Sequence, residues 1–255
     1  MTTESEKKIR KMLSLHKLGT VCVSPWLEQH GISRDLQAYY RRSGWLQSLG
    51  TGAFIKPDDT VSWTGGLYAL QEQLKAPIHA GAMTALSMQG MAHYVRMGTE
   101  KAYLFAPPKT KLPAWFKNHD WGEEIDYTAT SLLPESLGLQ PHEEKNYTVQ
   151  TSSPERAFLE CLHLTPEKLD LVECYHVMEG LTTLRPKLLQ SLLEQCSSIK
   201  VTRLFLYMAA KAGHDWYKRL DQSKFDLGKG SRTITQGGVY MSEFQIIVPE
   251  ELAKL

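Results

Sequence analysis

Four residues between positions 34 and 41 have the types and the spacing of a helix that reads DNA bases. At about 100° per residue on a helix, one stripe contains Arg34, Gln37, Ala38 and Arg41. Arginine makes bidentate hydrogen bonds to guanine, and glutamine can do the same to adenine. The sequence therefore predicts a recognition helix whose stripe enters the major groove while its apolar face packs inward. The alternative is a winged helix that binds a protein and leaves this polar face in solvent.

Three further residues complete the predicted DNA-binding site. Ser33 is expected to cap the N-terminus of the helix, because serine hydroxyls accept hydrogen bonds from the first free backbone amides. Arg42 at the helix end and Lys56 on a following wing would suit phosphates, which position a protein on DNA without specifying sequence.

A second group of basic residues lies between positions 199 and 232, partly on one face of a helix predicted over 199–212. Basic side chains beside an aromatic ring suit a phosphate backbone or an acidic protein surface, and a merely solvated helix face is the alternative. The glycine-rich loop within the group is not a P-loop, since Ser223 stands where the motif needs glycine. This predicted second basic surface comprises Lys200, Arg203, Tyr207, Lys211, Lys218, Arg219, Lys229 and Arg232.

Residues with catalytic or metal-binding potential are few. Cys161-x-His163 and Cys174-x-His176 resemble ligand pairs, but residues two apart on a helix face away from each other, and no C-x-x-C motif occurs. We therefore expect no metal, no cofactor and no catalysis. The alternative is a Mg²⁺-dependent nuclease, in which two carboxylates hold the metal and a lysine positions the attacking water. Its candidate residues are Asp126, Glu143 and Lys145.

The elements that would position the first site are predicted from caps and periodicity. A helix over 4–15, helices over 24–30 and 33–43 separated by a turn with Gly31, and strands over 45–49 and 53–56 form a winged helix-turn-helix. Thr64 is expected to cap a helix over 65–74, and a second helix is predicted over 79–94.

Beyond residue 95 the pattern becomes mixed. Strands are predicted at 102–105 and 147–149, a long helical stretch from 153 to about 220 with breaks near Pro166 and Pro186, and a hairpin over 232–248. We predict an α+β fold in which the N-terminal winged helix-turn-helix is followed by a larger mixed α/β C-terminal domain. The expected domains are residues 1–95, the winged helix with a helical extension, and residues 96–255.

Composition supports a globular cytoplasmic protein. The 255 residues contain 42% hydrophobic and 22% charged residues, and no apolar run reaches the roughly 18 residues of a membrane span. Four cysteines and a charged N-terminus without an apolar stretch behind it favour a reducing compartment. Residues 1–56 hold nine Lys and Arg against four Asp and Glu, residues 57–184 nine against seventeen, and residues 185–232 ten against four. Two basic blocks therefore flank an acidic middle segment. Separate basic surfaces are typical of nucleic-acid binders, and a random distribution of surface charge is the alternative.

Long sequence blocks resemble the AbiEi antitoxins of type IV toxin–antitoxin systems. These blocks are WTGGLYALQ at 63–71, IHAGAMTALSMQGMAHY at 78–94, YLFAPPKTKLPAWF at 103–116, VTRLFLYMAAKAGHDWYKRLD at 201–221 and FDLGKGSRTITQGGVYMSEFQIIVP at 225–249. The resemblance implies a winged-helix domain that binds double-stranded DNA at the operator of its own operon, a C-terminal antitoxin domain, and a nucleotidyltransferase-like toxin as the partner that it counteracts. A stand-alone winged-helix transcription regulator is the alternative.

Overall fold

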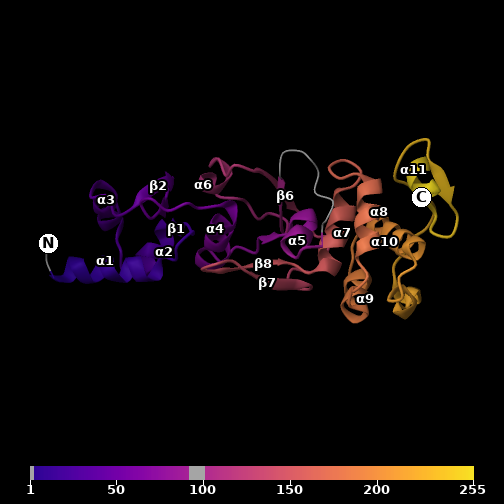
Figure 1. Ribbon diagram of the computed structural model, residues 1–255, viewed down its shortest axis with the longest axis horizontal. Helices are drawn as coiled ribbons and strands as arrows, with labels where there is room; N and C mark the ends of the chain where they lie inside the picture. The colour runs from indigo at the N-terminus through magenta and orange to yellow at the C-terminus, as the bar shows by residue number, and fades with distance from the viewer. Residues whose placement is uncertain (1–2, 92–100) are drawn as a thin grey trace.

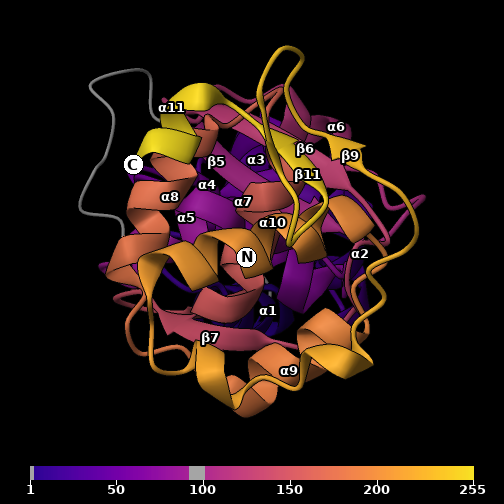
Figure 2. The same ribbon diagram turned by 90° about the vertical axis from the view of Figure 1, so that its right-hand side faces the viewer.

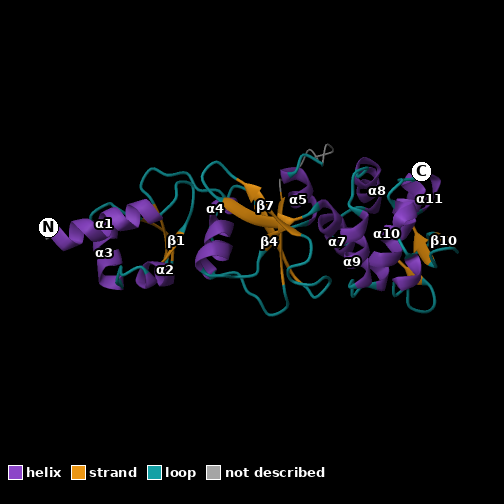
Figure 3. Ribbon diagram, turned by 90° about the horizontal axis from the view of Figure 1, so that it is seen from below, coloured by secondary structure: helices purple, strands orange, loops and turns teal. Residues whose placement is uncertain are grey.

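The computed structural model describes residues 3–91 and 101–255 of the chain. The molecule is elongated, and the N-terminal helices, a central sheet and the C-terminal helices follow one another along its long axis (Figure 1). The largest sheet lies in the middle, between two regions rich in helix (Figure 3). The fold is mixed α and β, with the predicted small N-terminal part and larger C-terminal part.

A winged helix-turn-helix occupies the N-terminal end. Its elements are α1 (Thr3–Leu15), β1 (Cys22–Val23), α2 (Ser24–Gln29), α3 (Arg34–Arg42), β2 (Gln47–Gly50) and β3 (Ala53–Ile55). The strands form an antiparallel sheet in the order β1-β3-β2. Gly31, with a φ of 85°, ends α2 in the left-handed conformation that glycine adopts without strain. Ser33 then caps α3, as predicted, because its hydroxyl accepts a hydrogen bond from the Leu36 amide at 3.4 Å.

Contacts with the next segment fix this unit against the centre of the molecule. The side-chain amide of Gln73 donates to the Val21 carbonyl at 2.7 Å, and its oxygen accepts from the Val23 amide at 2.8 Å. Gln73 thus imitates a neighbouring strand at the free edge of β1. A Cβ on Gly65 would lie 1.9 Å from the carbonyl oxygen of Gly19, so only glycine permits this close approach. The winged helix is therefore packed onto the central region.

The centre is a five-stranded sheet in the order β6-β5-β4-β8-β7. Only β4 against β5 and β7 against β8 pair antiparallel; β5 with β6 and β4 with β8 are parallel. The elements of this region are α4 (Trp63–Tyr68), the π-helix η1 (Ala69–Gln73), β4 (His79–Ala80), α5 (Ala82–Met88), β5 (Lys101–Ala106), α6 (Ala114–Lys117), β6 (Glu124–Ala129), β7 (Leu139–Glu143) and β8 (Thr148–Ser152).

Two predictions fail in this region. The predicted helix over 79–94 begins instead with β4, which pairs with strands far away in the sequence, and only then continues as α5. Thr64 lies inside α4, and Ser62 holds the N-cap position. The end of that predicted helix and the expected boundary after residue 95 lie outside the described residues. β4, which precedes this boundary in the chain, pairs with β5 and β8, which follow it.

Five α-helices and a small sheet form the C-terminal end, which faces the viewer in Figure 2. They are α7 (Pro154–Leu164), α8 (Leu171–Gly180), α9 (Pro186–Glu194) and α10 (Ile199–Ala212), followed by the 3-10 turns η2 (Tyr217–Arg219) and η3 (Gln222–Lys224), then β9 (Arg232–Thr233), β10 (Val239–Met241), β11 (Ile246–Val248) and α11 (Glu250–Lys254). The predicted hairpin is β10 with β11, and β9 adds a parallel strand that the sequence did not reveal. No helix in residues 3–91 or 101–255 is long and apolar enough to cross a membrane.

Candidate nucleic-acid interface

The outer surface of α3 is rich in cations. Its inward face is set by Gln37 and Tyr40, which are buried, and by the half-buried Leu36. Helical geometry then places the middle of the outer face between the half-buried Ala38 and the exposed Arg42. The other exposed side chains of the helix are Arg34, Asp35, Tyr39 and Arg41. Tyr39 is 38% exposed at the edge of this face.

Gln37 does not belong to the exposed stripe, which corrects the sequence prediction. It is only 3% exposed, and its amide nitrogen donates to the Ile32 carbonyl at 2.9 Å. Its amide oxygen accepts from the Ser24 hydroxyl at 2.7 Å. Buried polar groups need such partners, and here they join the start of α2 to the turn before α3. Gln37 therefore holds the helix-turn-helix together and is not available to an adenine edge in this conformation.

The predicted cations differ in how they are held. Arg34 donates from Nε to Glu28 Oε1 at 2.9 Å, but its side chain is 79% exposed. Such a surface pair is worth about 0–1 kcal/mol, so a phosphate or a base can replace the carboxylate. Arg41 and Arg42 are exposed at the C-terminal end of α3. Lys56 is half-buried, and its Nζ donates to the Leu13 carbonyl at 3.2 Å, so here it serves the C-terminal end of α1.

A groove of about 520 Å³ runs beside the recognition helix. Its lining comes from α3, from the start of α2 and from the turn between β2 and β3. Pro113 and Trp115 at the start of α6, which belong to the central region, also line it. The α3 residues that line it are Arg34, Gln37, Ala38 and Arg41.

The structure contradicts the second basic surface at its centre. Arg203 is 2% exposed, and its guanidinium donates to the carbonyl oxygens of Leu227 at 2.7 Å, Gly230 at 2.7 Å and Gln245 at 2.9 Å. Residues 201–209 of α10 are all buried, so this helix has no wide solvated face. The guanidinium binds the C-terminal tail and does not reach a partner molecule.

The other predicted members of that helix face also point to the protein itself. Tyr207 is 3% exposed, and its hydroxyl donates to the Leu252 carbonyl. Lys200 is half-buried and donates to the carbonyls of His163 and Thr165, and burial lowers the pKa of its amine. Lys211 donates to the Ala253 carbonyl at 3.4 Å. Amine and guanidinium donors on one helix stripe thus satisfy carbonyl acceptors of the segments around them.

The remaining members lie outside α10. Arg232 is half-buried beside its own loop, where its guanidinium donates to the carbonyls of Lys229 at 3.1 Å and Ser231 at 3.2 Å. The exposed members are Lys218, Arg219 and Lys229.

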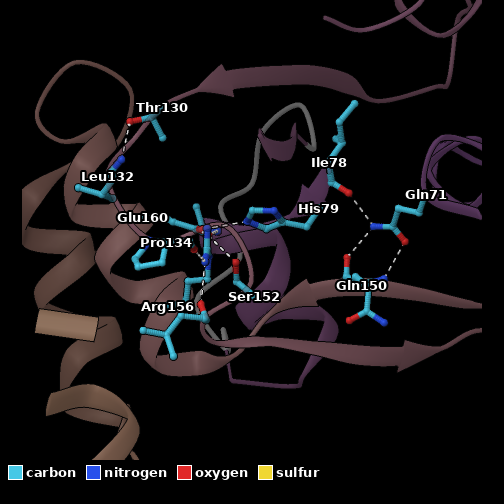
Figure 4. Close-up of polar contacts among 12 residues, drawn as sticks. Gln71, Ile78, His79, Thr130, Leu132, Pro134, Gln150, Ser152, Arg156 and Glu160 are labelled. Carbon is cyan, nitrogen blue, oxygen red and sulfur yellow. Dashed lines mark hydrogen bonds and ion pairs between the residues drawn. The ribbon is translucent and has the colours of Figure 1, made fainter. Parts of the chain in front are cut away.

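The most buried ionic cluster of the molecule was missed by the sequence analysis (Figure 4). The carboxylate of Glu160 on α7 accepts from His79 Nε2 at 3.0 Å, Arg156 Nε at 2.8 Å, the Ser152 hydroxyl at 2.7 Å and the Ala82 amide at 3.1 Å. Burial alone would raise the pKa of this carboxyl, but the charge and hydrogen bond of His79, followed by Arg156 and Ser152, lower it to about 2.

This cluster lines a cavity of about 320 Å³, but its polar groups bind one another and hold the fold together. A carboxylate has about four lone-pair sites, and Glu160 receives four donors from α7, β4, β8 and the start of α5. Arg156 also donates to the carbonyls of Pro134 and Leu137, which fixes the loop before β7. The only sequence signal was a histidine, an arginine and a glutamate inside apolar segments. The cluster joins the central sheet to the C-terminal helices.

The candidate nuclease residues are far apart. Asp126 lies on β6 and Glu143 on β7, which are opposite edges of the five-stranded sheet. Four strand spacings of about 4.8 Å separate the edges by roughly 19 Å. Asp126 instead binds the amine of Lys168 at 2.7 Å, and Lys145 is exposed in the turn after β7. One Mg²⁺ ion could not bind both carboxylates in this arrangement.

The cysteines are placed as packing residues. Cys22, Cys161 and Cys174 are buried and Cys196 is half-buried, all as free thiols. Burial raises the pKa of the Cys22 thiol to about 12, which makes it a poor nucleophile. Among the residues that the structure describes, no group of three or more His, Cys, Asp or Glu side chains is placed to hold a metal ion.

Comparison with known proteins covers nearly the whole chain. Residues 99–249 match a family described as "Transcriptional regulator, AbiEi antitoxin, Type IV TA system", and residues 5–97 match "Transcriptional regulator, AbiEi antitoxin N-terminal domain". No curated protein matches significantly. Among solved structures, the crystal structure of the RV2827C protein from Mycobacterium tuberculosis has a similar fold, with a TM-score of 0.60 and 15% identity over 95% of this chain and 89% of that chain.

Proposed function

Because the chain belongs to the AbiEi antitoxin family of transcriptional regulators from type IV toxin–antitoxin systems, we propose that it represses its own operon by binding operator DNA through α3. In the same proposal it counteracts a nucleotidyltransferase-like toxin encoded beside it. Operator binding is the part for which this chain's residues offer the more direct support.

One observation carries the DNA-binding proposal. The capped helix α3 exposes Arg34, Arg41 and Arg42, and the first two line a groove whose lining includes the turn between β2 and β3. In helix-turn-helix proteins the second helix enters the major groove, and arginine is the commonest side chain in specific contacts with guanine. Because Gln37 is buried, we assign base reading to the face around Ala38 and Arg42, with Arg34 and Arg41 at one side of it.

Operator binding is tested with the DNA upstream of the gene at one fixed salt concentration. Replacing a base-reading arginine costs about 1–3 kcal/mol, so Arg34→Ala and Arg42→Ala should each weaken binding roughly 5- to 150-fold. Arg219→Ala removes another exposed arginine, at the opposite end of the molecule, and serves as the matched control. Unchanged affinity and base preference in both α3 variants would remove α3 from the DNA interface.

The antitoxin half of the proposal needs a different readout. Exposed cations at the C-terminal end, Lys218, Arg219 and Lys229, remain from the predicted second basic surface and are proposed to serve toxin neutralisation. Reversing all three to glutamate should abolish rescue of cells that express the neighbouring toxin, while operator binding persists. Full rescue by this variant would exclude these side chains, and a wild-type chain that gives no rescue would favour the stand-alone regulator.

A further inference from the structure

We propose that the DNA-binding surface continues from the winged helix onto residues 107–119 of the central region, where Lys109, Lys111 and Lys117 contact the phosphate backbone beside the wing. This inference rests on the proposed operator binding and extends it to a part of the chain outside the helix-turn-helix.

The first observation is a local reversal of charge. Residues 57–184 carry nine Lys and Arg against seventeen Asp and Glu, yet residues 107–119 contain three lysines and no acidic residue. All three lysines are exposed. Within the part of the chain that the structure describes, none of them forms an ion pair. Three exposed amines without a carboxylate partner in an otherwise acidic region are the footprint of an anionic ligand.

The second observation is where the fold places this segment. The groove beside α3 is lined by Arg34 and Arg41 of the recognition helix and also by Pro113 and Trp115 of this segment. Lys111 and Lys117 lie two residues before Pro113 and two residues after Trp115. α3, β2 and α6 follow one another along the upper edge of the molecule in Figure 1. A duplex seated on α3 and the wing therefore reaches the lysine-bearing segment next.

The third observation is that this segment is rigidly attached to the wing. A Cβ on Gly50 of β2 would lie 3.0 Å from the Cβ of Trp115, so the two backbones are in close contact. The hydroxyl of Tyr127 on β6 donates to the Thr110 carbonyl at 2.7 Å, and the Trp121 indole donates to the Phe116 carbonyl at 2.8 Å. The lysines are therefore carried on a positioned backbone, and DNA binding does not have to order a loose loop.

Continuity with the α3 groove favours DNA over an acidic protein as the occupant. Phosphates on a duplex recur at regular spacing along the path that α3 and the wing define, whereas an isolated acidic patch on a protein would need no such alignment. The lysine ammonium is a point charge that binds phosphate well, and a phosphate contact does not depend on the base sequence. The three residues should therefore add affinity and register, and base selection should stay with α3.

The test measures how operator affinity falls with salt for the full chain. Each phosphate contact contributes about 0.9 to the slope of log affinity against log salt, so the triple variant K109Q/K111Q/K117Q should have a slope smaller by up to about 2.7. The control K187Q/K218Q/K229Q removes three exposed lysines at the opposite end of the molecule and should keep the wild-type slope. Circular dichroism and thermal unfolding establish that both variants are folded.

Hydroxyl-radical footprinting gives an independent readout. The wild-type chain should protect backbone positions on the wing side of the α3 contacts, and K109Q/K111Q/K117Q should lose these positions while the α3 protection remains. A wild-type slope and footprint in this variant would overturn the extension and leave operator binding through α3 intact. If the control variant loses the same amount of salt slope and protection, the effect comes from the overall charge of the protein. That result would also overturn the extension. If the wild-type chain does not bind the operator, the proposed function fails, and the extension fails with it.

Discussion

Replacing Arg203 with alanine should destabilise the C-terminal end of the molecule by about 3–5 kcal/mol. The guanidinium makes three hydrogen bonds of 2.7–2.9 Å to carbonyl oxygens and two longer contacts of 3.3–3.4 Å to Gly228 and the Gln245 side chain. A hydrogen bond to a charged group contributes about 1.5–3 kcal/mol net, and a buried acceptor left without its donor costs about 1–3 kcal/mol. Even the lower values, applied to three bonds, give a loss near 3–5 kcal/mol.

The loss should be local, because the bonded carbonyls all belong to residues 227–245. Amide hydrogen exchange should therefore report lower protection in β9 and β11, together with a lower urea midpoint. Arg203→Lys keeps the positive charge but not the planar, forked guanidinium, so its stability should lie between those of Arg203→Ala and wild type. Arg219→Ala, at an exposed position, should stay within about 0.5 kcal/mol of wild type. An Arg203→Ala variant as stable as Arg219→Ala would refute the structural role of Arg203. Arg203 would then be assigned again to the predicted second basic surface.

Two further predictions concern the buried carboxylate. The pKa of Glu160 is about 2 in the folded chain against an ordinary 4.5. The ionised carboxylate therefore adds about 3 kcal/mol to the free energy of unfolding. This contribution is fully present above pH 4.5 and is lost as the pH falls toward 2. Urea unfolding between pH 6 and 3 should show this acid loss in wild type and a flatter profile in Glu160→Gln; equal profiles would contradict the assignment. Gly81→Ala would place a Cβ 2.3 Å from Glu160 Oε2 and should cost about 1–3 kcal/mol in thermal or urea unfolding. Gly180→Ala, with open space around its Cβ, should be neutral, and a neutral Gly81→Ala would contradict the tight packing.

Local signals were sufficient for the winged helix. Gly31 and Ser33 act at the turn as their chemistry predicts, since a positive φ and an N-cap depend on a few consecutive residues. The two-residue strand β4 was not predictable in this way. The alanines at positions 80, 82 and 85 favour a helix locally, and only pairing with β5 and β8 makes His79 and Ala80 a strand.

The errors at Gln37 and Arg203 have one physical cause. A helical wheel counts polar residues as exposed, because burial of a polar group without a partner is costly. Both side chains avoid that cost with partners that periodicity does not reveal: Gln37 binds groups of Ser24 and Ile32, and Arg203 binds carbonyls 24 to 42 residues further along the chain. The fold must be known before such a residue can be assigned to the surface or to the core.

The net charge of a sequence block does not show how many of its cations face solvent. Residues 185–232 hold ten basic residues against four acidic ones, yet Lys200, Arg203 and Lys211 donate to carbonyl groups of the protein itself. The acidic block, in contrast, includes residues 107–119, which carry three exposed lysines and contribute Pro113 and Trp115 to the lining of the recognition groove. Charge reversal on α10 would therefore leave carbonyls without donors and bury carboxylates among them. Such a variant would measure stability, and recognition must be tested at cations whose amines face solvent.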